Sequence, residues 1–327
     1  MNIYITLDYE LFLGRNTGSV ERCLIEPMNE LYAIAKKYNI IFTLFVDAAY
    51  LYALKKFNYN NQIKNDYDNV CIHLQQLKKL GHEIQLHIHP QWFYVHWDGK
   101  WILPQQYYKL SDLPDNDVGE LFKTSKEILE ETVQGKVIAF RAGGFSTQPT
   151  SLLKELFLAN DIQIDSSVYP HGFYNSDYQR YDYLNAPEKD IYRFDSDICI
   201  EDRQGPFIEL PVSGYKVSPV FYWRYVFSRL AKSKKHLLYG NGNAVPLNND
   251  SIVERLIKKT NGLVSIDGLK ISYLNAALKA NMNSGSNHFC IIGHPKLATP
   301  YSLKKLESFC KNIPIKCSFS SISSVLS

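Results

Sequence analysis

The chain has 327 residues, of which 45% are hydrophobic and 21% are charged, and its formal net charge is +3. This length and composition can bury a sizeable core, which excludes a disordered chain and fits one large α/β domain or two smaller ones. The small net charge and the lack of a Lys/Arg block exclude a nucleic-acid-binding protein. Six scattered cysteines without a CxxC pair, and no basic segment followed by an apolar one at the N-terminus, predict a cytoplasmic protein with reduced thiols and no secretory signal.

Apolar strands alternate with helical segments along the chain. Short apolar and β-branched runs predict strands at residues 3–8, 40–46, 83–89, 137–142, 162–167, 207–212 and 288–293. Apolar residues at helical spacing predict helices at residues 26–38, 68–80, 117–133, 150–159 and 269–281. Seven strands separated by helices predict a parallel sheet closed into a barrel. We expect one domain over residues 1–327, with loop insertions at about 91–115, 169–205 and 214–262.

Two pairs of polar residues stand at the ends of the first and third predicted strands. Asp8 and Glu10 are two positions apart, and so are His87 and His89. Side chains at i and i+2 leave the same face of a strand, so each pair can converge on one metal ion. Either pair taken alone is equally consistent with polar side chains that face water or are satisfied in the core. Together they supply the imidazole and carboxylate ligands of a hydrolytic zinc site.

Three further polar residues stand at the ends of later predicted strands. Arg141 ends the fourth, Asp165 lies in the fifth, and His294 follows the seventh. In α/β barrels the carboxyl ends of the strands form the active face, so residues far apart in sequence meet there. This repeated placement predicts one catalytic site built from several strands.

Five segments resemble, in order, the motifs of one known family. They are TLDYE at 6–10, GHEIQLHIH at 81–89, RAGGF at 141–145, DSS at 165–167 and IGHP at 292–295. This pattern is similar to the polysaccharide deacetylases of the NodB-homology type, and most similar to a divergent branch associated with surface-polysaccharide biosynthesis. The resemblance implies a distorted (β/α)7 barrel, the NodB-like glycoside hydrolase/deacetylase fold. It also implies removal of acetyl groups from N-acetylated sugars with Zn²⁺ or another divalent metal ion.

The same resemblance suggests roles for the metal site. We expect Asp8, His87 and His89 to bind the metal ion, leaving positions for water and the substrate carbonyl. Glu10 is expected to act as the base. The opposite assignment, with Glu10 as ligand and Asp8 as base, stays open because the motif alignment places Asp8 at the base position.

The remaining candidates would support that chemistry. His294 is expected to protonate the leaving amine, and Asp165 to hold its imidazole in the useful tautomer. Arg141 is expected to orient the catalytic carboxylate through a bidentate pair. The alternatives are a turn histidine before Pro295, an Asx turn or helix cap at Asp165, and an ordinary strand-to-loop turn after Arg141.

Two longer segments are candidates for substrate and surface contacts. The tyrosine-rich residues 169–194 form either a loop that offers flat faces to sugar rings or a surface loop that packs on itself. Residues 219–236 combine aromatic and basic side chains, so this helix either lies on an anionic membrane or packs on the barrel.

We therefore predict a metal-dependent hydrolase that removes an N-acyl group, in the first instance acetyl, from a sugar unit during surface-polysaccharide biosynthesis. The partner is an N-acylated sugar or glycan, free or lipid-linked, and the location is the cytoplasm or the inner face of its membrane. No oligomeric state is predicted. Two alternatives are a metal-free amidase of the same superfamily that acts on a small amide, and a carbohydrate-binding protein without catalysis.

Overall fold

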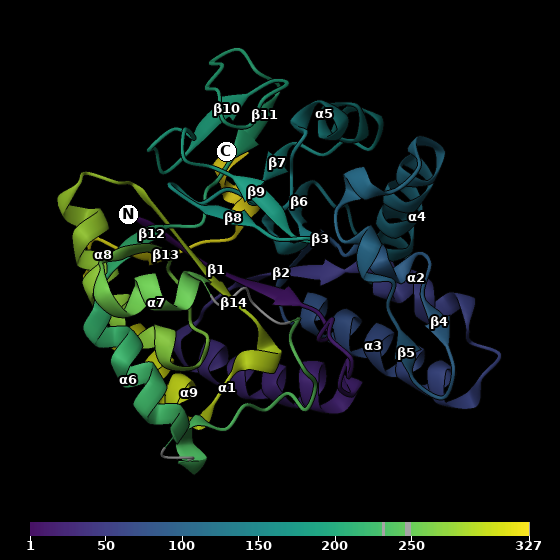
Figure 1. Ribbon diagram of the computed structural model, residues 1–327, viewed down its shortest axis with the longest axis horizontal. Helices are drawn as coiled ribbons and strands as arrows, with labels where there is room; N and C mark the ends of the chain where they lie inside the picture. Colours follow the sequence, from purple (N-terminus) through teal and green to yellow (C-terminus); the bar gives the residue numbers. More distant parts are fainter. Residues whose placement is uncertain (231–232, 246–249, 327) are drawn as a thin grey trace.

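Seven parallel strands form the centre of the sheet. The fold is known from a computed structural model that describes residues 1–230, 233–245 and 250–326. The strands stand in the order β11-β7-β6-β3-β2-β1-β14 (Figure 1), and each overlaps one of the seven predicted strands. Their bounds are β1 Asn2–Tyr9, β2 Phe42–Asp47, β3 Glu83–Ile88, β6 Ala139–Ala142, β7 Ile164–Asp165, β11 Phe207–Glu209 and β14 His288–Gly293. Two short strands extend the sheet: β10 (Tyr192–Phe194), antiparallel to β11, and β15 (Ser318–Phe319), parallel to β1.

Both faces of the central strands are buried. Every residue of β2 is buried, and so is every residue of β1 after Asn2. Side chains on one face fill the barrel and those on the other pack against helices, which is why these strands are nearly continuously apolar. The hydroxyl of Thr6, one of the buried polar residues within β1, donates to the carbonyl of Ile291 at 2.9 Å. All six cysteines are free.

The sheet curls until its two ends meet through a few irregular hydrogen bonds. The backbone N–H of Ser213, just after β11, donates to the carbonyl of Cys290 in β14 at 2.9 Å. The N–H of Val264 in turn donates to the carbonyl of Ser213 at 2.8 Å, and that of Ile292 donates to the carbonyl of Val264 at 3.1 Å. The predicted fold class, a distorted (β/α)7 barrel, is therefore confirmed.

Helices surround the curled sheet (Figure 1). Their bounds are α1 Glu26–Tyr38, α2 Ala48–Lys56, α3 Asn61–Lys79, α4 Asp115–Val133, α5 Thr150–Ala159, α6 Pro219–Leu230, α7 Asp250–Ile257, α8 Leu274–Asn283 and α9 Pro300–Lys311. The predicted helix 68–80 is only the second part of α3. The Asn60 side chain accepts hydrogen bonds from the N–H groups of Gln62 and Ile63, so the helix begins seven residues earlier than its apolar periodicity indicated. Helix α9, capped by Thr299, was not predicted.

Each predicted insertion carries its own small elements. Residues 91–115 contain the hairpin β4 (His96–Trp97) and β5 (Trp101–Ile102). Residues 169–205 contain β10 and the hairpin β8 (Phe173–Asn175) and β9 (Arg180–Asp182). Residues 214–262 contain α6, α7 and the antiparallel pair β12 (Gly214–Val217) and β13 (Thr260–Leu263), while positions 231–232 and 246–249 lie outside the described residues. The assignment of the whole chain to one domain stays a prediction.

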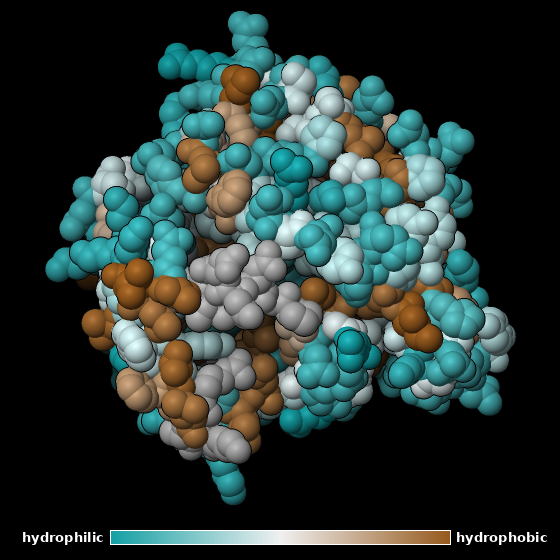
Figure 2. Space-filling view, viewed as in Figure 1, coloured by the Kyte–Doolittle hydropathy of each residue, from teal (hydrophilic) through white to brown (hydrophobic). Residues whose placement is uncertain are grey.

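Helix α6 leaves much of its apolar side uncovered. Phe221 is buried against the barrel, but Val220, Trp223, Phe227 and Leu230 are 46–71% exposed. Figure 2 shows hydrophobic side chains gathered over α6 and α7. Within the described ranges, no helix has the length and apolar character needed to span a membrane. The predicted basic residue Lys232 lies outside those ranges.

Candidate metal centre

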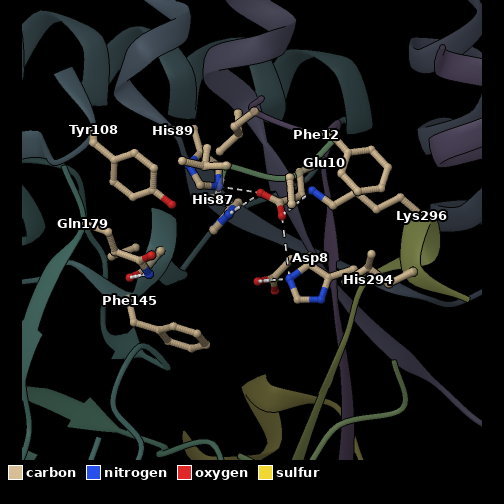
Figure 3. Close-up of a pocket in the computed structure, with 16 residues that line it drawn as sticks. Asp8, Glu10, Phe12, His87, His89, Tyr108, Phe145, Gln179, His294 and Lys296 are labelled. Atoms are coloured by element: carbon tan, nitrogen blue, oxygen red, sulfur yellow. Dashed lines mark hydrogen bonds and ion pairs between the residues drawn. The ribbon is translucent and has the colours of Figure 1, made fainter. Parts of the chain in front are cut away.

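Five of the seven strand-end candidates, all except Arg141 and Asp165, line one pocket of about 250 Å³ (Figure 3). Strands β1, β3 and β14 deliver them because the carboxyl ends of parallel strands open at the same edge of the barrel. Loops that follow these and other strands complete the wall. The lining residues are Asp8, Glu10, Phe12, Leu13, His87, His89, Tyr108, Ala142, Gly144, Phe145, Gln179, Ala244, Val245, His294, Lys296 and Leu297.

One carboxylate and two imidazoles converge at the base of this pocket. Oε2 of Glu10 lies 2.5 Å from Nε2 of His89 and 3.2 Å from Nε2 of His87. One ligand atom from each residue falls within 4.8 Å of the other two, and all three side chains are buried. Two nitrogens and one carboxylate oxygen form a donor set that proteins use to hold catalytic zinc.

The surrounding hydrogen bonds fit a metal site. Nδ1 of His87 donates to the backbone carbonyl of Arg141 at 2.7 Å, which fixes the ring and directs Nε2 toward Glu10. Such an outer hydrogen bond is usual for histidines that bind metal ions. The backbone N–H of His89 donates to Oδ1 of Asp47 at 3.2 Å, and this bond holds the second histidine at the end of β2. These residues fit a divalent ion.

Opposite charges decide the protonation of this cluster. Burial acts to raise the pKa of Glu10, but the Lys296 ammonium and the two imidazoles outweigh it and hold that pKa well below its usual value. Burial acts to lower the pKa of His87, whereas Glu10, Asp8 and Asp47 raise it to about 9. A metal ion bound by His87 would therefore have to displace a proton.

Asp8 belongs to a different set of contacts. Its Oδ1 accepts a hydrogen bond from Nη1 of Arg141 at 2.7 Å, and its Oδ2 lies 3.6 Å from Nε2 of His294. The prediction of a bidentate pair was wrong. The other guanidinium donors of Arg141 go to Ser166, with Nε bound to the carbonyl at 2.7 Å and Nη2 to the hydroxyl at 2.9 Å.

The geometry therefore divides the two acidic residues in the opposite way to our first assignment. Glu10, expected to be the base, is the carboxylate that meets both imidazoles. Asp8, expected to be a ligand, lies outside that cluster and faces His294. Glu10 follows the end of β1 and contacts the histidines at the end of β3, whereas Asp8 inside β1 is met by the long side chain of Arg141 from β6.

His294 faces the pocket from the end of β14 and is oriented by Asp267. Its Nδ1 lies 2.9 Å from Oδ2 of Asp267, and its backbone N–H donates to Oδ1 of the same carboxylate at 2.8 Å. Burial acts to lower the pKa of His294, but Asp267 and the pocket carboxylates raise it above its usual value. Burial acts to raise the pKa of Asp267, whereas His294 lowers it overall.

The predicted orienting role of Asp165 was wrong. Asp165 lies in β7, where its carboxylate accepts hydrogen bonds from the N–H (2.8 Å) and the hydroxyl (3.0 Å) of Ser167. Burial raises its pKa, and burial together with Asp165 raises the pKa of neighbouring Glu209. His294 instead follows β14, and the segment that ends at Asp267 runs beside this strand. The backbone N–H of Ile266 in that segment donates to the carbonyl of Ile292 in β14 at 2.9 Å.

Sequence reasoning missed three residues of the site: Asp47, Asp267 and Lys296. Asp47 ends β2, and Asp267 ends the short apolar run Leu-Val-Ser-Ile. Both obey the rule that polar residues at strand ends are candidates, and both were missed because only some strand ends were considered. Lys296 follows His294 by two positions and carried no separate signal.

Most of the tyrosine-rich insertion packs on itself. Tyr169 and Tyr181 are buried, and their hydroxyls are 3.0 Å apart. Phe145 of the pocket wall packs edge-to-face against both rings, and Gln179 from the β8–β9 turn also reaches the pocket. The insertion therefore supports the pocket wall and contributes only Gln179 to its lining.

No family model matches this sequence, and neither does any curated protein. Solved structures do resemble it. An allantoinase shares 14% identity, with a TM-score of 0.52 over 99% of this chain and 88% of its own. A protein of Pseudomonas aeruginosa PAO1 assigned as a polysaccharide deacetylase shares 13% identity, with a TM-score of 0.52 over 99% of this chain and 89% of its own.

A protein of Mycobacterium smegmatis assigned as a polysaccharide deacetylase is also similar. It shares 15% identity, with a TM-score of 0.50 over 92% of this chain and 76% of its own. At such identities the comparison establishes the fold. The chain therefore has the NodB-like barrel fold of the polysaccharide deacetylases.

Proposed function

We propose that this chain is a metal-dependent hydrolase that removes an N-acyl group, in the first instance acetyl, from a sugar unit. The observation that carries the proposal is the buried cluster of Glu10, His87 and His89, opposite Asp8 and His294 in one pocket. Its substrate would be an acylated glycan of the kind assembled into surface polysaccharides. The motif resemblance and the fold support this substrate class.

Glu10, His87 and His89 would hold the ion, which when bound lowers the pKa of water and polarises a carbonyl oxygen. Asp8 would take the proton from the attacking water. Arg141 holds Asp8 at 2.7 Å and fixes the direction of its free oxygen toward the pocket. The exchanged assignment of Asp8 and Glu10 is thus the one we propose.

His294 would deliver a proton to the leaving amine. Its Nδ1 is engaged by Asp267, so Nε2 is the atom that faces the pocket and its carboxylates. The raised pKa of His294 favours the protonated ring near neutral pH, as a general acid requires. Tyr108, Phe145 and Gln179 line the wall where a sugar would lie, and the Tyr108 hydroxyl points into the pocket (Figure 3).

The first test combines metal analysis with an assay for acetate. Wild type should contain about one zinc or similar ion per chain and release acetate from an N-acetylglucosamine tetrasaccharide. The double variant His87→Ala/His89→Ala should lose both properties. Asp8→Asn should keep the ion and lose turnover, which separates a base from a ligand. His96→Ala, at an exposed position in β4, is the matched control and should behave as wild type.

The outcomes separate the candidate functions. Wild type that takes up no ion, even after incubation with zinc, would refute the metal mechanism. Binding of the tetrasaccharide without turnover, unchanged in His294→Ala, would instead identify a carbohydrate-binding protein.

A second candidate function is metal-free hydrolysis of a small amide. It is favoured by one contact, the Lys296 ammonium 2.8 Å from Oε1 of Glu10, which places a cationic group in the pocket beside the proposed metal ligands. The structural similarity to an allantoinase also supports it. Turnover of allantoin that persists in EDTA would favour this candidate, whereas deacetylation abolished by EDTA and restored by zinc would exclude it.

Contact with a lipid surface would bring a lipid-linked substrate to the site. Exposed Trp223 and Phe227 on α6, followed by exposed Lys234 and Lys235, match an anionic bilayer in both polarity and charge. Wild type should sediment with vesicles that contain phosphatidylglycerol but not with pure phosphatidylcholine, and Trp223→Ser/Phe227→Ser should abolish binding. Equal sedimentation of the variant would contradict this contact.

A further inference from the structure

Lys296 is a buried cation inside the pocket. It lies in the short 3₁₀ turn Pro295–Leu297 after β14, and only 5% of it is exposed. Lysines are almost never buried this deeply unless a negative group pairs with them. Its position therefore has to be explained by what its ammonium contacts.

Two oxygens hold the ammonium in place. Nζ donates to Oε1 of Glu10 at 2.8 Å and to the backbone carbonyl of Leu11 at 2.6 Å, and it lies 4.9 Å from the centre of the Phe12 ring. The carbonyl of Lys296 itself accepts from the N–H of Gly240 at 3.0 Å. Backbone and side chain are both anchored, so the charge has a fixed position.

This contact gives the two oxygens of the Glu10 carboxylate different partners. Oε2 meets the imidazoles of His87 and His89, while Oε1 accepts from Lys296 at 2.8 Å and lies 3.6 Å from Nε2 of His294. An ion held by Oε2 of Glu10 would therefore share this carboxylate with the Lys296 ammonium, which binds Oε1. The ammonium neutralises part of the ligand's charge and repels a second cation, and both effects are strong where water is excluded.

We propose that Lys296 lowers the affinity of the Glu10, His87 and His89 cluster for a divalent ion. The inference rests on the proposed function in treating this cluster as the metal site. Its consequence is that the site fills only when free metal ion is abundant, because the ion has to bind beside an ammonium group that already contacts the ligand carboxylate. Removal of that charge at constant side-chain size would make the ion bind more tightly.

The test is a zinc titration of the metal-free protein against a competing chelator, with no enzymatic readout. Lys296→Gln removes the charge and keeps an N–H donor for the Leu11 carbonyl, and Lys296→Met serves as a second neutral variant if the first fails to fold. Each neutral variant should bind zinc at least about 10-fold more tightly than wild type. Lys296→Arg keeps the charge and should bind as wild type, as should Lys36→Gln at an exposed position.

Two results would overturn the inference in distinguishable ways. If wild type and the folded neutral variants bind zinc with equal affinity, Lys296 has no influence and only this inference fails. If none of them binds zinc, the metal site itself fails and the proposed function fails with it.

Discussion

Arg141→Met should destabilise the protein through the charge it leaves behind. Arg141 is fully buried, and three of its nitrogens donate hydrogen bonds, one to Asp8 and two to Ser166. Methionine fills a similar volume but donates nothing, so the Asp8 carboxylate would remain buried without its partner. The stability of the barrel thus depends on a pair that the active site also uses.

The magnitude follows from that burial. Removal of one member of a buried ion pair costs about 3–5 kcal/mol, since the remaining charge is no longer compensated. At a urea dependence of roughly 3 kcal/mol/M, this corresponds to a midpoint about 1–1.7 M lower. The double variant Arg141→Met/Asp8→Asn carries no unpaired charge and should be more stable than Arg141→Met by on the order of 1 kcal/mol.

Urea unfolding followed by circular dichroism and tryptophan fluorescence measures these midpoints. Arg22→Met is the matched control, because the exposed pair of Arg22 and Glu26 within one helical region should cost only about 0.3–0.5 kcal/mol. The reasoning is refuted if Arg141→Met costs no more than this control. It is also refuted if the double variant is less stable than Arg141→Met alone.

Three further predictions concern the site and its supports. Asp267→Asn removes the charge that orients His294, the proposed general acid, so acetate release should fall about 10²- to 10⁴-fold while zinc content stays unchanged. Burial lowers the pKa of His82 from 6.5 to about 4. As the pH falls, His82 is therefore protonated in the unfolded chain before it is protonated in the folded one. The free energy of unfolding should decrease from pH 6.5 toward pH 4 by up to about 1.4 kcal/mol per pH unit. In urea titrations across this range, His82→Gln should lose less of that free energy than wild type. A Cβ at Gly143 would lie 2.6 Å from Nδ1 of His89, so Gly143→Ala should weaken zinc binding about 10- to 100-fold in a titration.

Each of these has a contrary result. Loss of zinc from Asp267→Asn would place Asp267 among the metal supports, and a wild-type pH dependence in His82→Gln would show that its protonation is unimportant. For the glycine, the control is Gly119→Ala in α4, where a Cβ meets nothing within 4 Å. It should leave zinc affinity unchanged and slightly stabilise the helix, so equal affinity in both alanine variants would contradict the steric argument.

The sequence by itself determined the seven strands and the polar residues at their ends. Strands buried on both faces must be almost continuously apolar, so each is visible as a local pattern, and Asp8, Glu10, His87, His89 and His294 stand directly on that pattern. The helix starts were less visible. The side chain of a single capping residue such as Asn60 sets where α3 begins, and helical periodicity does not include it.

Only the tertiary structure decided which of these residues meet. The choice of Glu10 over Asp8 as partner of the imidazoles depends on side-chain reach between β1 and β3, and not on spacing along one strand. Asp267, rather than Asp165, orients His294 because the run before Asp267 closes the barrel beside β14 while β7 lies elsewhere in the sheet. Sequence patterns record which face a side chain takes, whereas these contacts depend on which strands become neighbours.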